Sequence, residues 1–198
     1  SNDIKRIKTT AAKIEKKLGY PCFVKPANAG SSVGITKAHN KDELIEGLKL
    51  AAAHDSKIVV EKAVVGREIE CAVLGNGSRI EASCVGEIIA AAEFYDYDAK
   101  YNNSESKTVV PAVISKEKQD EIRNMAVKVF KAVDGSGLAR VDFFVENETE
   151  NVIFNELNTL PGFTPISMYS MLWSACGKPM NVLLDELIDL ALEKFGCK

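Results

Sequence analysis

The sequence lacks the features that mark membrane and secreted proteins. Its longest apolar run near the middle, residues 88–92, is far shorter than the roughly 18 residues of a membrane-spanning helix. The N-terminal segment is polar and rich in lysine, without the apolar centre of a signal peptide. We therefore predict no membrane partner.

The cysteine and histidine patterns of disulfide-rich or zinc-binding proteins are also missing. The five cysteines form no C-x-x-C pair, and their odd number argues against a disulfide framework. Scattered reduced thiols are typical of the cytosol, so we expect a cytoplasmic protein. The two histidines, His39 and His54, fall at the ends of predicted elements, where surface positions without a functional role are the default.

The chain has no strong excess of either charge. Its net charge of −3 argues against a nucleic-acid partner, because binding a phosphate backbone normally requires a basic surface. A single nucleotide needs only two or three nearby cations, so a nucleotide-binding protein is not excluded. The length of 198 residues and the hydrophobic content of 46% fit one large or two small globular domains.

Helices and strands alternate irregularly along the chain, which predicts the α+β class. Apolar residues recur at spacings of three and four in the predicted helices, over residues 4–18, 40–52, 115–133 and twice within 165–195. Strands are predicted over residues 21–25, 33–38, 57–61, 67–74, 79–90, 138–145 and 152–158.

Two polar signals predict helix starts, and one segment has no periodicity. Asn40 and Ser115 are each expected to cap a helix, and the second helix should turn Ile122, Phe130 and Val133 inward. Residues 93–107 are polar and aperiodic, which predicts a long loop of the kind that often carries function.

The two late strands contain the most informative polar residues. Period-two alternation places Arg140 and Asp142 on one face of the first strand, and Phe154, Glu156 and Asn158 on one face of the second. If the strands pair as a hairpin, these polar groups share a face. Oxygen ligands of this kind suit Mg²⁺, and a nearby arginine suits an anionic transition state. The alternative is a set of surface salt bridges, which is disfavoured because unpaired charges in apolar strands are costly.

The segment after Lys25 is a small-residue loop, residues 27–32, that follows a strand. Backbone N–H groups in such a loop bind phosphate oxygens, and the lysine adds a positive charge. The pattern differs from G-x-x-x-x-G-K-[ST], because here the lysine precedes the glycines. A glycine-serine hairpin turn with a surface lysine gives the same pattern, so this segment alone favours no binding site.

Further candidate ligand groups lie at strand ends and in the polar loop. Glu61 ends an apolar strand and Glu68 follows a turn, which suits binding of an adenine amino group and ribose hydroxyls. Exposed strand-end charges look the same in sequence. A lysine such as Lys100 on a mobile loop suits closure over phosphates, and a solvated loop is the alternative.

Five segments occur in a fixed order between about Leu18 and the last helix: VKPANAGSSVG, VEKAVVGREIE, YDYDAKY, GLARVDFFV and NELNTLPGFTPIS. Together they resemble the ATP-grasp superfamily and, within it, the D-alanine–D-alanine ligase family. The resemblance implies an ATP-grasp fold, in which two α+β subdomains grip ATP between them. Residues 1–61 would belong to the central subdomain, truncated at its N-terminal side, and residues 62–198 to the C-terminal subdomain with the metal site.

The family's chemistry is an ATP-dependent ligation of two D-alanines for peptidoglycan precursor synthesis. ATP phosphorylates the carboxylate of the first D-alanine, and the amine of the second attacks the resulting acyl phosphate. The resemblance therefore implies D-alanine and ATP as partners, Mg²⁺ (or Mn²⁺) as cofactor, and a homodimeric parent protein.

The resemblance also assigns nucleotide-binding residues. Lys25 and Lys100 would bind the phosphates, and Glu68 would hold the ribose. The adenine would lie against Lys62 and along the segment from Glu61 to Val64.

A second group of residues would carry the chemistry. The resemblance makes Asp142, Glu156 and Asn158 the Mg²⁺ ligands, with Glu156 bridging two ions. Arg140 would stabilise the tetrahedral oxyanion together with the backbone at Gly162.

The remaining assignments concern loop closure and the second substrate. Ser31 and Tyr101 match residues that hold the mobile loop closed, and Lys100 with Tyr101 resembles the D-alanine-specific type rather than the D-lactate type. Ser167 and Met168 match the site for the second substrate's carboxylate.

One departure from the family pattern and two alternatives accompany this interpretation. No segment matches the N-terminal domain of the family, so we expect the chain alone to lack ligase turnover. The first alternative is another ATP-grasp carboxylate–amine ligase, against which the YDYDAKY and NTLPG segments speak. The second is a non-catalytic nucleotide-binding module, which would not need an oxyanion stabiliser such as Arg140.

Overall fold

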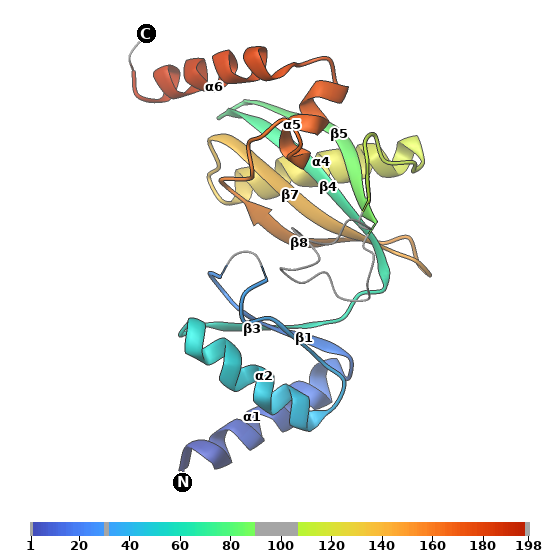
Figure 1. The fold of residues 1–198 in the computed structure, drawn as a ribbon, viewed down its shortest axis with the longest axis vertical. Coiled ribbons are helices and arrows are strands. Elements are labelled where there is room, and N and C mark those ends of the chain that lie inside the picture. The colour runs from blue at the N-terminus through green and yellow to red at the C-terminus, as the bar shows by residue number, and fades with distance from the viewer. Residues whose placement is uncertain (1, 30–31, 90–106, 197–198) are drawn as a thin grey trace. The chain divides into compact units, whose positions relative to one another are not determined.

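The computed structural model describes residues 2–29, 32–89 and 107–196, and these form two compact units (Figure 1). The first unit contains the described residues up to Val64. The second begins at Val65 and contains the rest of the described chain. Within the described residues, no helix is both long and apolar enough to cross a membrane.

The first unit is a three-stranded antiparallel sheet with two helices on one face (Figure 1). Its strands run in the order β2-β1-β3, and its elements are α1 (Asn2–Leu18), β1 (Cys22–Pro26), β2 (Thr36–Ala38), α2 (Lys41–His54) and β3 (Ile58–Lys62). Cys22 and Val24 are buried with residues of both helices, so alternation places Phe23 and Lys25 on the opposite face.

The predicted helix caps are confirmed. The side chain of Asn40 accepts hydrogen bonds from the backbone N–H groups of Asp42 and Glu43, and Glu43 in turn accepts one from the backbone of His39. Ser115 accepts from the backbone N–H of Lys118 in the same manner. These bonds satisfy backbone donors that a helix start otherwise leaves unpaired.

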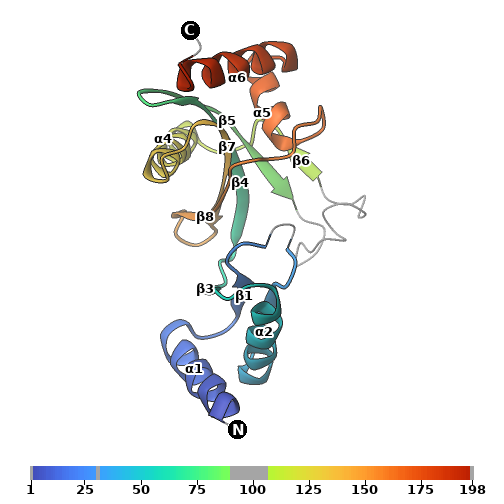
Figure 2. The same cartoon turned by 90° about the vertical axis from the view of Figure 1, so that its left-hand side faces the viewer.

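The second unit is a five-stranded antiparallel sheet in the order β6-β5-β4-β7-β8, with helices on both faces (Figure 2). Its elements are β4 (Gly66–Asn76), β5 (Arg79–Ile89), β6 (Lys107–Val109), α4 (Lys116–Ala132), β7 (Gly137–Glu146), β8 (Val152–Asn158), α5 (Met168–Ala175) and α6 (Met180–Lys194). The last two helices confirm the predicted break near residues 177–179.

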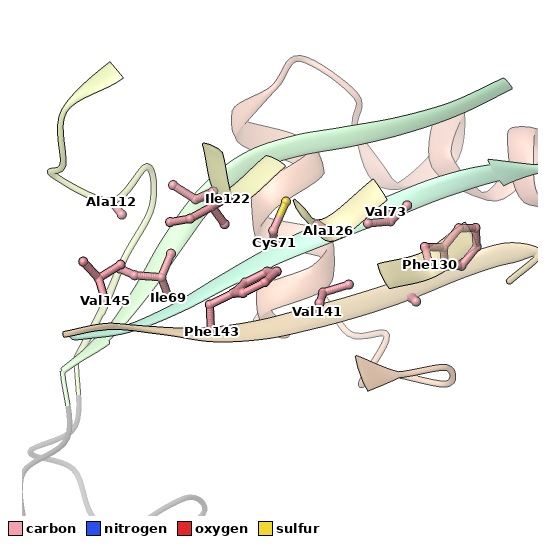
Figure 3. Close-up of a cluster of buried hydrophobic side chains, with 12 residues drawn as sticks. Ile69, Cys71, Val73, Ala112, Ile122, Ala126, Phe130, Val141, Phe143 and Val145 are labelled. Carbon is pink, nitrogen blue, oxygen red and sulfur yellow. The ribbon is translucent and has the colours of Figure 1, made fainter. Parts of the chain in front are cut away.

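Alternation along the central strands builds an apolar core on each face. One face packs against α4 (Figure 3), with a core of Ile69, Cys71, Val73, Val85, Ala112, Ile122, Ala126, Phe130, Ala139, Val141, Phe143 and Val145. On the other face, Ala72 and Leu74 pack against α5 and α6. The preceding residues of β4 on that face, Glu68 and Glu70, are carboxylates, so apolar side chains line only part of it.

A β-bulge in β8 contradicts one prediction from alternation. Asp142 pairs with Glu156, whereas Phe143 pairs with Phe154, so β8 holds one extra residue between its two partners. Phe154 therefore turns to the α4 face, where its ring meets that of Phe143 edge-on at 6.2 Å between centroids. The expectation that Phe154 shares a face with Glu156 and Asn158 is wrong.

Three smaller expectations also differ from the structure. Val133 is 55% exposed, because it follows the last turn of α4 as its C-cap and does not face the core. Strand β2 begins at Thr36 rather than at residue 33. Strand β6 was not predicted, and its first residue, Lys107, belongs to the segment predicted as a loop. The other residues of that predicted loop, 93–106, lie outside the described residues.

The burial of Phe130 predicts a large stability effect. We expect Phe130→Ala to lower the free energy of unfolding by about 3 to 5 kcal/mol, because Phe130 is 1% exposed and its removal leaves a cavity. Phe195→Ala is the matched control, since Phe195 is 77% exposed and should change stability by less than about 0.5 kcal/mol. Urea denaturation measures both, and equal losses would contradict the assigned core.

Candidate active site

Three carboxylates form a row across three neighbouring strands of the larger sheet. Glu70 on β4 is the register partner of Asp142 on β7, and Asp142 is the register partner of Glu156 on β8. Like charges directly opposite one another destabilise a sheet. The row therefore requires compensating positive charge.

Arg140 supplies part of this compensation from within the sheet. Its Nε and Nη2 donate to Oδ1 and Oδ2 of Asp142, both at 2.7 Å, which is the paired geometry that guanidinium and carboxylate groups favour. Its Nε also lies 3.0 Å from Oε2 of Glu70. One guanidinium thus contacts two carboxylates on adjacent strands.

Arg140 and its two carboxylate partners, Glu70 and Asp142, form what we call the Arg140 cluster, and their side chains are largely buried. The side chains of Asp142, Glu70 and Arg140 are 3%, 7% and 18% exposed. Burial by itself lowers the pKa of Arg140, but the hydrogen bonds with Asp142 and the charges of Asp142, Glu70 and Glu156 raise it, and the net pKa is raised. A raised arginine pKa keeps its stabilising charge throughout the ordinary pH range.

Asn158 joins the carboxylates on the other side of the row. Its Nδ2 donates to Oδ2 of Asp142 at 2.9 Å and to Oε1 of Glu156 at 3.3 Å. The predicted hairpin is confirmed, since β7 and β8 pair with Arg140 opposite Asn158. The four residues predicted from these strands, Arg140, Asp142, Glu156 and Asn158, are therefore brought together.

The donor set fits a hard divalent cation. Three carboxylates and one guanidinium leave an excess of negative charge, and Glu156 is exposed, so the cluster is open to solvent on the β8 side. Turning the Asn158 amide would exchange Nδ2 for its oxygen. Asp142, Glu156 and Asn158 would then each present an oxygen of the kind that Mg²⁺ binds. In the described part of the chain, no group of three or more His, Cys, Asp or Glu side chains is already spaced to hold a metal ion.

Sequence reasoning missed Glu70, although a signal for it exists. Glu70 is a carboxylate among apolar neighbours, between Ile69 and Cys71, and period two places it on the same face as Glu68. A buried carboxylate needs a charged or hydrogen-bonding partner. The alternation rule that found Arg140 and Asp142 would have found Glu70 if applied to β4.

The loop between β8 and α5 places the next predicted residues. A Cβ added to Gly162 would lie 2.9 Å from the hydroxyl of Ser167, so a larger residue here would require that hydroxyl to move. The Ser167 hydroxyl accepts from the backbone N–H of Thr164 and lies 2.8 Å from the Thr164 hydroxyl. The side chain of Met168 is buried in the apolar cluster under α5, so only the Met168 backbone is in a position to contact a ligand.

The first unit holds the predicted nucleotide-binding residues up to Val64. Lys25 Nζ lies 2.8 Å from Oε2 of Glu61, and both belong to the sheet face opposite the helices. Lys62 is the register partner of buried Cys22 and so belongs to the face opposite Glu61. Val64 follows β3 and is partly exposed.

Three predicted residues lie outside the described residues: Ser31, Lys100 and Tyr101. Glu68 is described, and it lies on the same face of the larger sheet as Glu70, opposite Phe144 of β7. The larger unit therefore holds Glu68 and the Arg140 cluster on one face, and the smaller unit holds the ion pair of Lys25 with Glu61.

Comparison with known proteins gives a consistent result over nearly the whole chain. A family model described as "D-ala D-ala ligase C-terminus" matches residues 1–189. Among curated relatives, the D-alanine--D-alanine ligase of Acetivibrio thermocellus is 57% identical over 184 residues, which is 93% of this chain and 49% of that protein. The ligase of Thermoanaerobacter pseudethanolicus is 53% identical over 197 residues, which is 99% of this chain and 54% of that protein.

Solved structures agree with the sequence comparison. The D-alanine-D-alanine ligase from Coxiella burnetii matches with a TM-score of 0.81 and 37% identity, covering 95% of this chain and 49% of the other. The VanG D-Ala:D-Ser ligase from Enterococcus faecalis matches with a TM-score of 0.83 and 40% identity, covering 92% and 53%. The predicted α+β, ATP-grasp fold class is confirmed.

The buried Arg140 cluster predicts a pH-dependent loss of stability on substitution. We expect Arg140→Gln to lower the free energy of unfolding by about 3 to 5 kcal/mol near neutral pH, because two buried carboxylates lose their cation. Protonation removes that uncompensated charge, so the loss should shrink as the pH falls from about 7 to about 4.

Denaturant titrations across this pH range measure the effect. The control is Arg79→Gln, whose exposed pair with Glu193 should be worth less than about 1 kcal/mol at any pH. A loss that stays constant as the pH falls would contradict the assigned charge balance.

Proposed function

Because the chain belongs to the D-alanine–D-alanine ligase C-terminal family, we propose that it is the catalytic part of an ATP-dependent ligase that joins two D-alanines. The chain spans about half the length of the curated relatives that it matches. The proposed activity therefore belongs to a longer parent protein. The chain alone is expected to lack turnover.

The observation that carries this proposal is the Arg140 cluster. A guanidinium beside two carboxylates, next to an exposed carboxylate and an amide, suits a reaction in which anions are brought together. We assign Asp142, Glu156 and Asn158 as ligands of Mg²⁺ (or Mn²⁺). When bound, such an ion neutralises phosphate charge, which eases attack by a carboxylate.

The remaining residues of the second unit have roles in binding and charge stabilisation. Arg140 and the backbone N–H of Gly162 would stabilise the oxyanion that forms when the second amine attacks the acyl phosphate. The Ser167 hydroxyl and the Met168 backbone N–H, at the start of α5, would bind the carboxylate of the second substrate, because a helix N-terminus favours an anion.

The remaining assigned residues would bind ATP. Lys25 would contact phosphate oxygens, with Glu61 holding its side chain in place. Glu68 would accept hydrogen bonds from the ribose, Lys62 would lie against the adenine, and the segment from Glu61 to Val64 would contact the adenine edge. Lys100 would contact the phosphates, while Ser31 and Tyr101 would hold a loop closed, which protects an acyl phosphate from water.

The proposal also covers the product, its cellular location and the residue limits of the two subdomains. The product would be a dipeptide precursor of peptidoglycan, made in the cytoplasm by a homodimeric parent. Residues 1–61 would belong to the central ATP-grasp subdomain and residues 62–198 to the C-terminal one.

A second candidate concerns the second substrate. VanG, which is 40% identical and has a TM-score of 0.83, is a D-Ala:D-Ser ligase. D-serine differs from D-alanine by one hydroxyl group. D-serine is therefore the competing second substrate for this chain's parent.

Phosphate release from Mg-ATP by the full-length parent tests the proposal. We expect release with D-alanine and formation of the dipeptide, and no release above background with L-alanine. Addition of D-serine to limiting D-alanine measures the second candidate through the mixed dipeptide. If the parent binds Mg-ATP but releases no phosphate in response to a carboxylate, the ligase proposal is overturned in favour of a nucleotide-binding module. If the 198-residue chain alone makes D-alanyl-D-alanine, the expectation that turnover needs the parent is contradicted.

Lys25 provides a test of the nucleotide assignment. We expect Lys25→Met in the full-length parent to weaken ATP binding on the order of tenfold, because a charge-assisted hydrogen bond to phosphate is lost. Adenosine binding should be unchanged.

The matched control is Lys37→Met, since Lys37 lies on the neighbouring strand opposite Phe23, on the same face as Lys25. Calorimetric titrations with ATP and adenosine give both affinities. Equal losses for the two ligands, or an equal loss in the control, would contradict a phosphate-binding role for Lys25.

A further inference from the structure

In the proposed site, Asp142 has two roles, because it accepts hydrogen bonds from Arg140 and is also a ligand of the cation. Both of its oxygens accept hydrogen bonds from Arg140, and Oδ2 also accepts one from Asn158. A carboxylate has about four lone-pair sites, so these contacts use most of its capacity. A cation bound at Asp142 would compete with Arg140 for the same oxygens.

Glu70 gives Arg140 a second carboxylate contact at Nε, the nitrogen that also donates to Asp142. The Nε–H of Arg140 donates to Oδ1 of Asp142 at 2.7 Å, and Oε2 of Glu70 lies 3.0 Å from the same nitrogen as an ion-pair partner rather than a hydrogen-bond acceptor. The Glu70 side chain is 7% exposed, and a buried carboxylate is costly without a cation close by. Nothing in the sequence-based assignment used this residue.

The order of the three carboxylates across the strands gives Glu70 and Glu156 different neighbours. Glu70 lies on the β4 side of Asp142, next to Arg140, while Glu156 lies on the β8 side, where the cluster is exposed. A cation approaching from solvent would meet Glu156 and Asn158 before it met Glu70. Glu70 is therefore placed to hold the arginine rather than the cation.

We propose that Glu70 is a positioning residue that anchors Arg140 when the Asp142 carboxylate is engaged by a cation. This inference rests on the proposed function, since it assigns Asp142 to the cation and Arg140 to the developing oxyanion. Without Glu70, the guanidinium would lose its remaining carboxylate as Asp142 turned away. With Glu70, Arg140 keeps its place on the sheet while Asp142 changes partner.

The Nε–H signal of Arg140 in ¹⁵N NMR of the 198-residue chain tests the anchor directly. Asp142→Asn removes the charge of Asp142 and so imitates a carboxylate engaged by a cation. We expect hydrogen exchange at Arg140 Nε to rise by less than about threefold in Asp142→Asn, because the ion pair with Glu70 still holds the guanidinium in place. In the double variant with Glu70→Gln, exchange should rise by a further factor on the order of ten.

The pair of Arg67 with Glu87 is the matched control. Arg67 donates to both oxygens of Glu87 at 2.7 and 2.6 Å in the same sheet, so Glu87→Gln should affect the Arg67 signal and leave Arg140 unchanged. Equal exchange in Asp142→Asn with and without Glu70→Gln would overturn the inference.

A single variant keeps the test decisive if Asp142→Asn does not fold. Glu70→Gln alone should shift the Arg140 Nε–H resonance, because the charged oxygen 3.0 Å from Nε becomes neutral. An unmoved resonance would overturn the inference. These NMR signals require neither metal nor turnover. If the parent releases no phosphate, the proposed function fails, and the NMR result still shows separately whether Glu70 anchors Arg140.

Discussion

The ion pair of Arg140 with two buried carboxylates constrains the rest of the second unit. Glu70 and Asp142 lie opposite one another on β4 and β7, and neither tolerates burial without a cation. A one-residue slip between these strands would turn one carboxylate to the opposite face, into the apolar core under α4. The register of the central strand pair is therefore tied to the charge cluster as well as to the core.

This constraint divides one face of the sheet into two parts. Where β4 continues as Ala72 and Leu74, α5 and α6 cover it with apolar side chains. Where β4 carries Glu68 and Glu70, the face is polar and includes the exposed Glu156. The opposite face is apolar against α4 along both central strands (Figure 3). The apolar core on the α4 face thus lies directly behind the charged residues of the other face.

Much of this arrangement could be predicted from the sequence, because it depends on short-range rules. Alternation alone placed Arg140 and Asp142 on one face, and the helix caps at Asn40 and Ser115 followed from side-chain chemistry. The bulge in β8 could not be predicted, because one extra residue between two register partners depends on pairing across strands. Glu70 was missed for a related reason, since its importance comes from a partner about seventy residues away in sequence.

The central claim is that the polar part of this face binds a divalent cation through Asp142, Glu156 and Asn158. Anomalous diffraction from crystals of the chain grown with Mn²⁺ and ATP tests it most directly. The account predicts a single peak, or two close peaks bridged by Glu156, about 2.0 to 2.3 Å from oxygens of these three residues. Mn²⁺ bound elsewhere on the chain, with Arg140 still closing both oxygens of Asp142, would contradict it.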